Sequence, residues 1–335
     1  MIVALTGATG AVGSAVMHHL SRQDWVEQIV VLGRRRPDRL PGRAHFVRWE
    51  LGDRWPDEAV SAAVGRGADV GSGVDAGRGA DAGRGADAGS CVDALVHAAF
   101  IIEDTSRQAE AFAANVEGSL RLISTAAGAG VRHITFVSSA NAYGLRSGPD
   151  PLAESEPISD APSHFYLHHK FLCEIAIRSF AQLGGDATFA IARPCMVVGP
   201  GVANSALSTM TSDPLIYPAP AHSSYQFIGV DDVADALARI VGSMAGGTFN
   251  LAPDDSLTVR DIARAQGHRA IGVPLWLARK ASDLGFATGL TTFSSRWVTY
   301  GDPVMRPSRS RDVLGWRATR SSREALRLIA GITQG

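Results

Sequence analysis

The sequence predicts an α/β fold in which helices cover both faces of a doubly wound, parallel β-sheet. Two observations predict it: short apolar runs rich in β-branched residues alternate with helical patterns, and a glycine-rich turn directly follows the first run. Nearly continuous apolarity is typical of strands that are buried on both faces of a parallel sheet. Alternating strands and helices indicate βαβ units.

The expected elements follow one another along the first 250 residues. We expect strands at 2–5, 29–32, 44–49, 94–99, 134–137, 188–192 and 248–251, and helices at 11–21, 108–127, 165–182 and 232–241. After Gly199 the pattern loosens into Pro- and Ser-rich loops and further helical segments. We therefore assign 1–200, with 225–252 returning to it, to the sheet domain. Residues 201–224 and 253–335 are expected to form a smaller, discontinuous C-terminal substrate lobe.

One segment, 65–94, breaks this pattern with five hexads: GRGADV, GSGVDA, GRGADA, GRGADA and GSCVDA. It contains few large apolar side chains, so it cannot offset the entropy lost on ordering. We interpret 65–92 as a low-complexity, disordered insert before the fourth strand. A binding role for the repeat is the alternative.

Composition limits the classes of partner. The formal net charge of −1 gives no electrostatic basis for binding nucleic acid or an anionic membrane. Cys91, Cys173 and Cys195 have neither metal-binding nor redox spacing, which fits a reduced compartment. No apolar run approaches the roughly 20 residues that span a bilayer, and Met1 leads directly into a strand. We expect a cytoplasmic protein that acts on a small molecule.

The turn after the first strand reads TGATGAVG over residues 6–13. Its small residues allow the backbone to approach a pyrophosphate, and the following helix start favours the negative charge. A strand before it and a helix after it are the context that supports such a motif. The turn predicts a Rossmann-type nucleotide site; an ordinary tight turn is the alternative. The expected contacts are Gly7, Thr9, Gly10, Ala11, Val12 and Gly13.

The second strand ends in Gly33-Arg34-Arg35-Arg36. A carboxylate at this position would bind the ribose 2′-hydroxyl of NAD, whereas arginine accommodates the 2′-phosphate of NADP. We therefore expect a preference for NADP(H), with NAD(H) as a possible cofactor. Arg34 and Arg35 are the expected phosphate-binding residues, and a solvated basic loop is the alternative.

Tyr166 and Lys170 stand four residues apart in an expected helix and so share one face. A nearby cation favours phenolate and would lower the phenol pKa from about 10 toward a useful range for acid–base catalysis. The chain has five Tyr and only two Lys, so this spacing is improbable by chance. Ser139 follows the fifth strand, at the edge where open α/β sheets bind ligands. It could hold a substrate oxygen while Tyr166 exchanges a proton.

These motifs together resemble the extended short-chain dehydrogenase/reductase family, also called NAD-dependent epimerase/dehydratase proteins. The resemblance rests on TGATGAVG (6–13), VHAAF (96–100), NVEGSLRLI (115–123), VSSANAYG (137–144), YLHHK (166–170), ARPCMVVGPG (192–201), FIGVDDVADAL (227–237) and LGWRATRSSREAL (314–326). It implies that Tyr166 is the acid/base, that Lys170 binds the nicotinamide ribose and tunes Tyr166, and that Ser139 and Asn115 belong to the active site. It also implies cofactor contacts at Glu50, Leu51, His97, Ala98, Ala99, Pro194, Met196 and Val197.

The sequence departs from the family pattern in ways that bear on the substrate. Ser139 is followed by Ala140 and Asn141 rather than by the Asp-Glu pair of 4,6-dehydratases. Tyr225 and Gln226 stand where nucleotide-sugar epimerases often carry a phosphate-binding arginine. We therefore expect hydride transfer between NADP(H) and a carbonyl or alcohol. A nucleotide-sugar epimerase and a non-catalytic NADP(H)-sensing protein are the alternatives.

Three further patterns have plain structural interpretations. His164 and His168 have no third ligand, so we expect no metal site and place them on an outer or homodimeric face of the 165–182 helix. Asp231-Asp232 is expected to cap the helix that follows. The apolar stretch 274–286 is expected to pack over the substrate cleft; a membrane-seeking helix is the alternative.

Overall fold

The protein is described by a computed structural model that covers residues 1–66, 91–102, 105, 107–146, 150–219, 223–288 and 302–330. The repeated hexads lie mainly at 67–90, outside the described residues.

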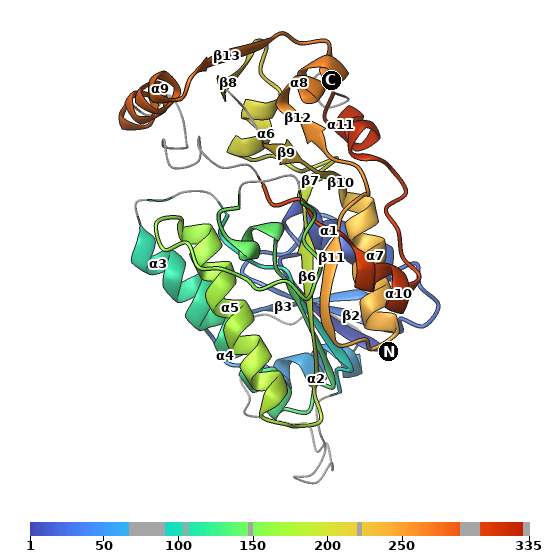
Figure 1. The fold of residues 1–335 in the computed structure, drawn as a ribbon. Helices are drawn as coiled ribbons and strands as arrows, with labels where there is room; N and C mark the ends of the chain where they lie inside the picture. The colour runs from blue at the N-terminus through green and yellow to red at the C-terminus, as the bar shows by residue number, and fades with distance from the viewer. Residues whose placement is uncertain are drawn as a thin grey trace.

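Seven parallel strands form the main sheet (Figure 1). They are β1 (Ile2–Thr6), β2 (Gln28–Gly33), β3 (Ala44–Arg48), β4 (Ala94–His97), β5 (His133–Val137), β6 (Thr188–Pro194) and β11 (Gly247–Leu251). Their spatial order is β3-β2-β1-β4-β5-β6-β11. The predicted doubly wound, Rossmann-type sheet is confirmed. Its strand order reverses direction between β1 and β4, where the carboxyl ends of the strands leave a crevice for a ligand.

Helices cover both faces of the sheet, as the nearly continuous burial of its strands requires. On one face lie α1 (Ala11–Leu20) and α7 (Val230–Gly242), whose apolar side chains share a core with β1 and β6. On the other face lie α2 (Asp57–Arg66), α4 (Ser119–Gly128) and α5 (Phe165–Gln182). Between β4 and β5 the chain forms α3 (Gln108–Phe112), then a π-helical segment η1 (Ala113–Gly118), then α4. The predicted single helix at 108–127 is thus interrupted by a π-helical segment.

A smaller unit with its own core lies beyond the carboxyl ends of the strands (Figure 1). It contains α6 (Ser205–Met210), β8 (Leu215–Ala219), β9 (Ser224–Tyr225), β12 (Leu257–Thr258), α8 (Val259–Gln266), β13 (Ala270–Pro274), α9 (Leu275–Ala287) and α11 (Ser322–Ala330). Strands β7 (Met196–Val198) and β10 (Phe227–Gly229) pair where this unit meets the sheet. The short strands pair with partners that are distant in sequence, for example β8 with β13.

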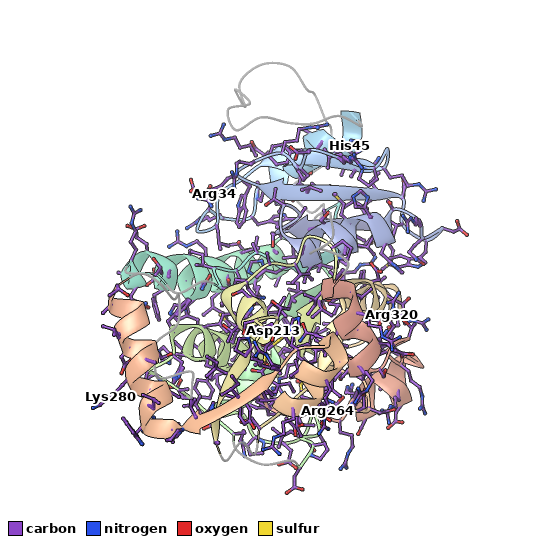
Figure 2. The ribbon with its side chains drawn as sticks, turned by 90° about the horizontal axis from the view of Figure 1, so that it is seen from above. Arg34, His45, Asp213, Arg264, Lys280 and Arg320 are labelled. Atoms are coloured by element: carbon purple, nitrogen blue, oxygen red, sulfur yellow. The ribbon has the colours of Figure 1, made fainter. Side chains whose placement is uncertain are left out.

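The segment after β13 forms helix α9, and several of its large apolar side chains are exposed. Trp276 is 62% exposed and Leu284 is 66% exposed. Figure 1 shows α9 at the end of β13, away from the sheet, and Figure 2 shows Lys280 of this helix at the periphery. The helix packs against β8 and β13 instead. Packing of 274–286 over a substrate cleft therefore stays a prediction.

The C-terminal segment returns to the sheet domain. Helix α10 (Ser308–Leu314) packs on β11 and α7, and Trp316 is buried in the core on that face. Asp232 is 3% exposed, and its carboxylate accepts hydrogen bonds from the backbone N–H (3.0 Å) and hydroxyl (2.7 Å) of Thr319. Among the residues that the structure describes, no side-chain hydrogen bond caps the start of α7 at Gly229. Asp231 and Asp232 both lie in the first turn of α7, as predicted, but the Asp232 carboxylate bonds to the tail at Thr319 rather than to the helix N–H groups.

Neither a membrane-spanning helix nor a metal centre is found in the part of the chain that the structure describes. No described helix is long and apolar enough to cross a bilayer. No three His, Cys, Asp or Glu side chains of the described ranges come together as metal ligands would.

Candidate active site

The glycine-rich turn joins β1 to α1, and two of its glycines are required by close backbone contacts. Gly7 has a φ of +77°, and a Cβ there would lie 2.7 Å from the carbonyl carbon of Ala98. A Cβ on Gly13 would lie 2.2 Å from the Gly7 carbonyl oxygen. Within the described residues, no side chain caps the start of α1 at Gly10. The turn is therefore a tight cradle that opens onto the first N–H groups of a helix, which suits a pyrophosphate.

A buried hydrogen-bonded trio supports this turn from behind. Thr6 Oγ1 accepts from the backbone N–H groups of Ala98 and Ala99, both at 3.2 Å. The same hydroxyl lies 2.7 Å from His97 Nδ1, and His97 Nε2 lies 2.8 Å from the Ser119 hydroxyl. Burial, and secondarily the charge of Lys170, lowers the pKa of His97 to about 3, so the ring is neutral. His97 itself is fully buried and positions the loop rather than lining the pocket.

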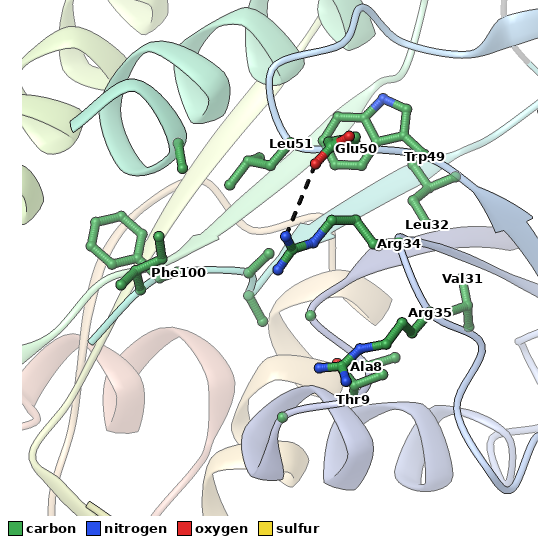
Figure 3. A pocket seen from close by; sticks show the side chains of 17 residues that line it. Ala8, Thr9, Val31, Leu32, Arg34, Arg35, Trp49, Glu50, Leu51 and Phe100 are labelled. Carbon is green, nitrogen blue, oxygen red and sulfur yellow. Dashed lines mark ion pairs between the residues drawn. The ribbon is translucent and has the colours of Figure 1, made fainter. Parts of the chain in front are cut away.

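A cavity of about 330 Å³ opens between this turn and the ends of β2 and β3 (Figure 3). Nine predicted cofactor residues line it: Gly7, Thr9, Gly10, Arg34, Arg35, Glu50, Leu51, Ala98 and Ala99. Arg34 Nη1 lies 4.0 Å from Glu50 Oε1, and both side chains are largely exposed. Figure 3 shows Arg34 directed toward Glu50 and Arg35 directed toward Ala8 and Thr9.

The remaining predicted cofactor residues are not among those that line this cavity. Ala11, Val12 and Gly13 form the first turn of α1. Pro194 ends β6, and Met196 and Val197 begin β7. Tyr166 and Lys170 lie on α5, next to the loop that follows β4.

Lys170 is almost fully enclosed, with 2% of its side chain exposed. Its ammonium donates a hydrogen bond to the Val137 carbonyl at 2.7 Å and lies 3.4 Å above the ring centre of Phe100. The ring centre of Phe136 is 4.6 Å away and that of Tyr166 is 5.7 Å away. Burial lowers the pKa of Lys170 to about 7, although the nearby Cys173 and Glu174 act in the opposite direction.

Tyr166 and Ser139 meet at the carboxyl end of β5. Burial raises the pKa of Tyr166 to about 12; the hydrogen bond with Ser139 acts against this shift, and the charge of Asp302 adds to it. Lys170 is not among the groups that shift this pKa, so its effect on Tyr166 stays a prediction. In this structure the ammonium contacts the Val137 carbonyl and the Phe100 ring, and it lies 5.7 Å from the ring centre of Tyr166.

Asn115 lies in η1 and uses its whole side-chain amide to hold the β4 loop. Its Oδ1 accepts from the Ile101 N–H at 2.7 Å, while its Nδ2 donates to the Ile101 carbonyl at 2.9 Å and to His169 Nδ1 at 3.3 Å. His169 is buried between the rings of Phe112 and Phe165. Burial, with a smaller effect of His168, lowers the pKa of His169 to about 4. A π-helical segment often marks a functional site, and here it presents Asn115 to this loop.

Sequence reasoning missed several residues that the structure brings to this region. Phe100 lines the cavity and covers Lys170, and Trp49 forms part of the same wall. Phe100 is the last residue of the recognised VHAAF motif and Trp49 directly precedes Glu50, so position in or beside a motif was the available signal. Asp302 affects Tyr166 and Tyr225, and burial raises its own pKa to about 6. No local pattern marks Asp302, because it comes from a segment 136 residues beyond Tyr166 in the chain.

The other candidate positions have structural partners. His168 Nδ1 lies 2.7 Å from Asp160 Oδ1. Gln226 is 1% exposed; its amide donates to the carbonyls of Pro253 and Met305, and its oxygen accepts from the Met305 N–H. Gln226 therefore fastens the chain around β10.

Several solved structures share this fold over nearly their whole length. MoeE5 in complex with UDP-glucose and NAD is 18% identical, with a TM-score of 0.71, and the match covers 100% of this chain and 99% of that one. The UDP-glucose 4-epimerase of Thermotoga maritima with UDP-glucose is 18% identical, with a TM-score of 0.70 and the same coverage. The dTDP-glucose 4,6-dehydratase of Bacillus anthracis in complex with NAD is 13% identical, with a TM-score of 0.69 over 100% and 96% of the two chains.

A comparison with curated protein sequences finds no match to this chain. The model of the NAD dependent epimerase/dehydratase family matches residues 3–252, which include the whole main sheet except Ile2 at the start of β1. The chain therefore belongs to the NAD-dependent epimerase/dehydratase family and is an oxidoreductase-type enzyme of the extended short-chain dehydrogenase/reductase kind.

Proposed function

We propose that this enzyme transfers a hydride between NADP(H) and a small carbonyl or alcohol substrate. The observation that supports this most is the convergence of Tyr166, Ser139 and Lys170 at the carboxyl end of β5, beside the glycine-rich cradle. The cradle suits a dinucleotide, because its turn packs so tightly on neighbouring backbone at Gly7 and Gly13 that only glycine fits, as in a phosphate-binding turn. The bound nicotinamide would supply or accept the hydride.

In this proposal the chain's own residues handle the proton. Tyr166 donates its phenolic proton to the substrate oxygen as the carbonyl becomes an alcohol, and takes a proton in the opposite direction. Burial keeps the phenol protonated, and the hydrogen bond with Ser139 acts in the direction that eases release of this proton. The Ser139 hydroxyl holds the same substrate oxygen. Lys170 orients the nicotinamide ribose, and Asn115 acts by fixing the β4 loop through Ile101.

The preference for NADP(H) rests on Arg34 and Arg35 at the rim of the cavity. The Arg34–Glu50 contact is a weak, exposed ion pair at 4.0 Å, so a phosphate dianion can replace it at little cost. Arg35 extends from the same strand end toward the phosphate loop (Figure 3). NAD(H) remains an alternative cofactor, since a relative such as MoeE5 was solved with NAD.

Two alternatives remain for the reaction. The solved UDP-glucose 4-epimerase supports nucleotide-sugar epimerisation, which would leave the cofactor unchanged after each cycle. Against it, the Gln226 side chain is used internally by Pro253 and Met305. A non-catalytic NADP(H) sensor would bind cofactor without turnover. The retention of Ser139, Tyr166 and Lys170 together argues against that alternative.

The cofactor assignment is tested by thermal shift with NADP⁺ and with NAD⁺ on the wild type and on Arg34→Ala, with Arg36→Ala as the control. We expect NADP⁺ to stabilise the wild type more, and Arg34→Ala to reduce the NADP⁺ shift by about 1–3 kcal/mol of binding free energy. The response to NAD⁺ should change little. An unchanged NADP⁺ response in Arg34→Ala would contradict the assignment.

The reaction is tested on the loaded enzyme with a panel of ketones, aldehydes and nucleotide sugars. Net oxidation of NADPH with a ketone or aldehyde supports the proposal. Sugar interconversion without net oxidation supports the epimerase, and tight cofactor binding without turnover supports the sensor.

We also propose that the chain is cytoplasmic, and that its sheet domain and smaller lobe divide near residues 200, 225 and 252. A homodimer through helix α5 is part of this proposal, because Ile175 on that helix is 44% exposed. Sedimentation of the wild type and of Ile175→Glu tests the dimer, and a monomeric wild type would exclude it.

A further inference from the structure

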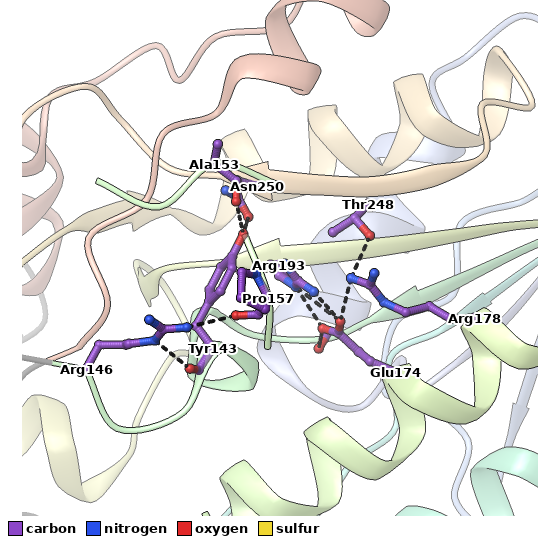
Figure 4. Close-up of polar contacts among 10 residues, drawn as sticks. Tyr143, Arg146, Ala153, Pro157, Glu174, Arg178, Arg193, Thr248 and Asn250 are labelled. Carbon is purple, nitrogen blue, oxygen red and sulfur yellow. Dashed lines mark hydrogen bonds and ion pairs between the residues drawn. The ribbon is translucent and has the colours of Figure 1, made fainter. Parts of the chain in front are cut away.

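A fully buried ion pair lies one turn beyond Lys170 on α5. Glu174 and Arg193 each have no exposed surface. The Arg193 Nε donates to both carboxylate oxygens of Glu174, at 2.9 and 3.2 Å, and Nη2 donates to Oε2. Arg193 directly precedes Pro194 at the end of β6, and its guanidinium lies 4.3 Å above the ring centre of Tyr143. Figure 4 shows the carboxylate facing this guanidinium, with Arg178 on its other side.

The Glu174 carboxylate also reaches the end of β5. The Ser138 hydroxyl, itself buried, donates to Glu174 Oε1 at 2.6 Å. Ser138 lies between Val137, whose carbonyl accepts from Lys170, and Ser139, whose hydroxyl bonds to Tyr166. Three consecutive residues of this strand end are therefore each held by a polar side chain of α5.

The helix residues involved are spaced four apart, at 166, 170 and 174, so they form one stripe along α5. Their three contacts with residues 139, 137 and 138 make a ladder, which we call the α5–β5 ladder. In the third contact, Glu174 accepts a hydrogen bond from Ser138, and the same carboxylate also accepts from Arg193 of β6. Any slip of the helix along the strand would break all three contacts together.

Burying a charged pair is a poor way to gain stability, because desolvation of both ions offsets their attraction. Well-packed apolar residues of similar size would stabilise the same space equally well. The Glu174–Arg193 pair is instead suited to fixing one placement of α5 against β6. The planar guanidinium and the carboxylate bond well in only a few relative orientations.

We propose that Glu174 and Arg193 are positioning residues, which set the register of α5 against β5 and β6 so that Tyr166, Lys170 and Ser139 hold their working geometry. This inference rests on the proposed function for its catalytic meaning, but the register itself can be measured without a substrate.

The test replaces the pair by apolar residues of similar length, Glu174→Met with Arg193→Met. We expect a melting temperature within a few degrees of the wild type, because apolar replacement of a buried pair is often neutral. The affinity for NADP⁺ should stay within about threefold. For the carbonyl compound that the wild type reduces, kcat should fall by about 10–100-fold with little change in KM, as expected for a misplaced catalytic group. Arg178→Met, which removes only the half-exposed neighbour of Glu174 at 3.7 Å, is the control and should behave like the wild type.

The second readout uses the fact that the chain has only two lysines, Lys170 and Lys280. In protein labelled with ¹³C-lysine, the ε-methylene signal of Lys170 should be displaced by the ring currents of Phe100 and Phe136. Lys280→Arg assigns the two signals. In the apolar-pair variant we expect the Lys170 displacement to fall by at least about half, because the ladder loosens.

A folded apolar-pair variant with an unchanged Lys170 signal and unchanged kcat would overturn the proposal, since the pair would then only fill space. If that variant does not fold, Ser138→Ala decides: it keeps the ion pair and removes one contact of the ladder. A Lys170 signal in Ser138→Ala identical to that of the wild type would equally overturn the proposal. If the wild type reduces no carbonyl in the panel, the proposed function fails, while the lysine signal still decides the register.

Discussion

The Tyr166 hydroxyl is the single atom group on which the proposed chemistry depends. Tyr166→Phe removes the proton donor but keeps the ring that packs edge-on against Phe100, with ring centres 5.9 Å apart. We expect kcat/KM for carbonyl reduction to fall by about 10²–10⁴-fold, while NADP⁺ affinity stays near that of the wild type. Steady-state kinetics and a cofactor titration measure the two effects.

Tyr217→Phe is the matched control for this substitution. The Tyr217 hydroxyl accepts a hydrogen bond from Arg260 at 2.9 Å in the smaller lobe, so its loss should affect stability slightly and turnover little. Substantial activity remaining in Tyr166→Phe would remove the acid/base role from this residue.

At the scale of an element, the turn between β1 and α1 tolerates no added side chain at Gly13. Gly13→Ala would push a methyl group to 2.2 Å from the Gly7 carbonyl oxygen, and neither backbone can give way without moving α1. We expect a loss of about 1–3 kcal/mol in the free energy of unfolding and a strong loss of NADP⁺ affinity. Gly65→Ala in helix α2, where a Cβ meets nothing within 4 Å, should be neutral or stabilising. Urea unfolding of both variants checks this contrast.

The anchor between α7 and the C-terminal tail gives a second prediction at this scale. Asp232→Asn weakens the charge-assisted bonds to Thr319 and the ion pair with Arg320, so we expect a loss of about 1–3 kcal/mol in the free energy of unfolding. The adjacent Asp231→Asn is the control, because Asp231 is exposed. Equal effects of the two substitutions would mean that the tail is not held by Asp232.

For the whole molecule, buried histidines make stability depend on pH. Burial lowers the pKa of His133 to about 4, and burial with the charge of Lys170 lowers that of His97 to about 3. Below the unfolded value of 6.5 the unfolded chain takes up protons that the folded chain refuses, so stability is present above pH 6.5 and is lost as pH falls toward 4. Asp302, whose pKa is raised to about 6 by burial, acts in the opposite direction.

His133→Gln isolates one of these contributions. Between pH 7 and pH 5 the wild type should lose about 2 kcal/mol more than this variant, at about 1.4 kcal/mol per pH unit below 6.5. His45→Gln, on the edge strand β3 and partly exposed, is the control and should keep the wild-type pH dependence. Urea unfolding at the two pH values decides, and an unchanged slope in His133→Gln would contradict the assignment.

The sheet domain was largely predictable from sequence because its signals are local. Each strand of the main sheet lies within a few residues of an apolar run, and α5 begins and ends where its pattern predicts. The smaller lobe was not predictable in detail. Strands such as β9 and β12 contain two residues each and exist only because they pair across the lobe.

The candidate site divides in the same way. The cradle at 7–13, Arg34 and the Tyr166–Lys170 helix carry local patterns, and the structure brings them to one edge of the sheet. The partners of Glu174 and Asp232 depend on which distant segment is packed against them. A charged residue in an otherwise apolar run, Arg193, indicates a buried partner of opposite charge. The sequence does not identify that partner, Glu174, because it lies 19 residues away on another element.

The last strand of the sheet, β11, reaches its place only after the chain has left the domain to build part of the lobe, and Trp316 completes the core later still. During synthesis the residues of the nucleotide cradle therefore leave the ribosome long before β11, the last strand of the sheet, has been made. The sheet domain can complete its fold only when nearly the whole polypeptide has been made. A truncated product that lacks β11 and Trp316 would leave the edge of β6 unpaired and expose the apolar face of α7.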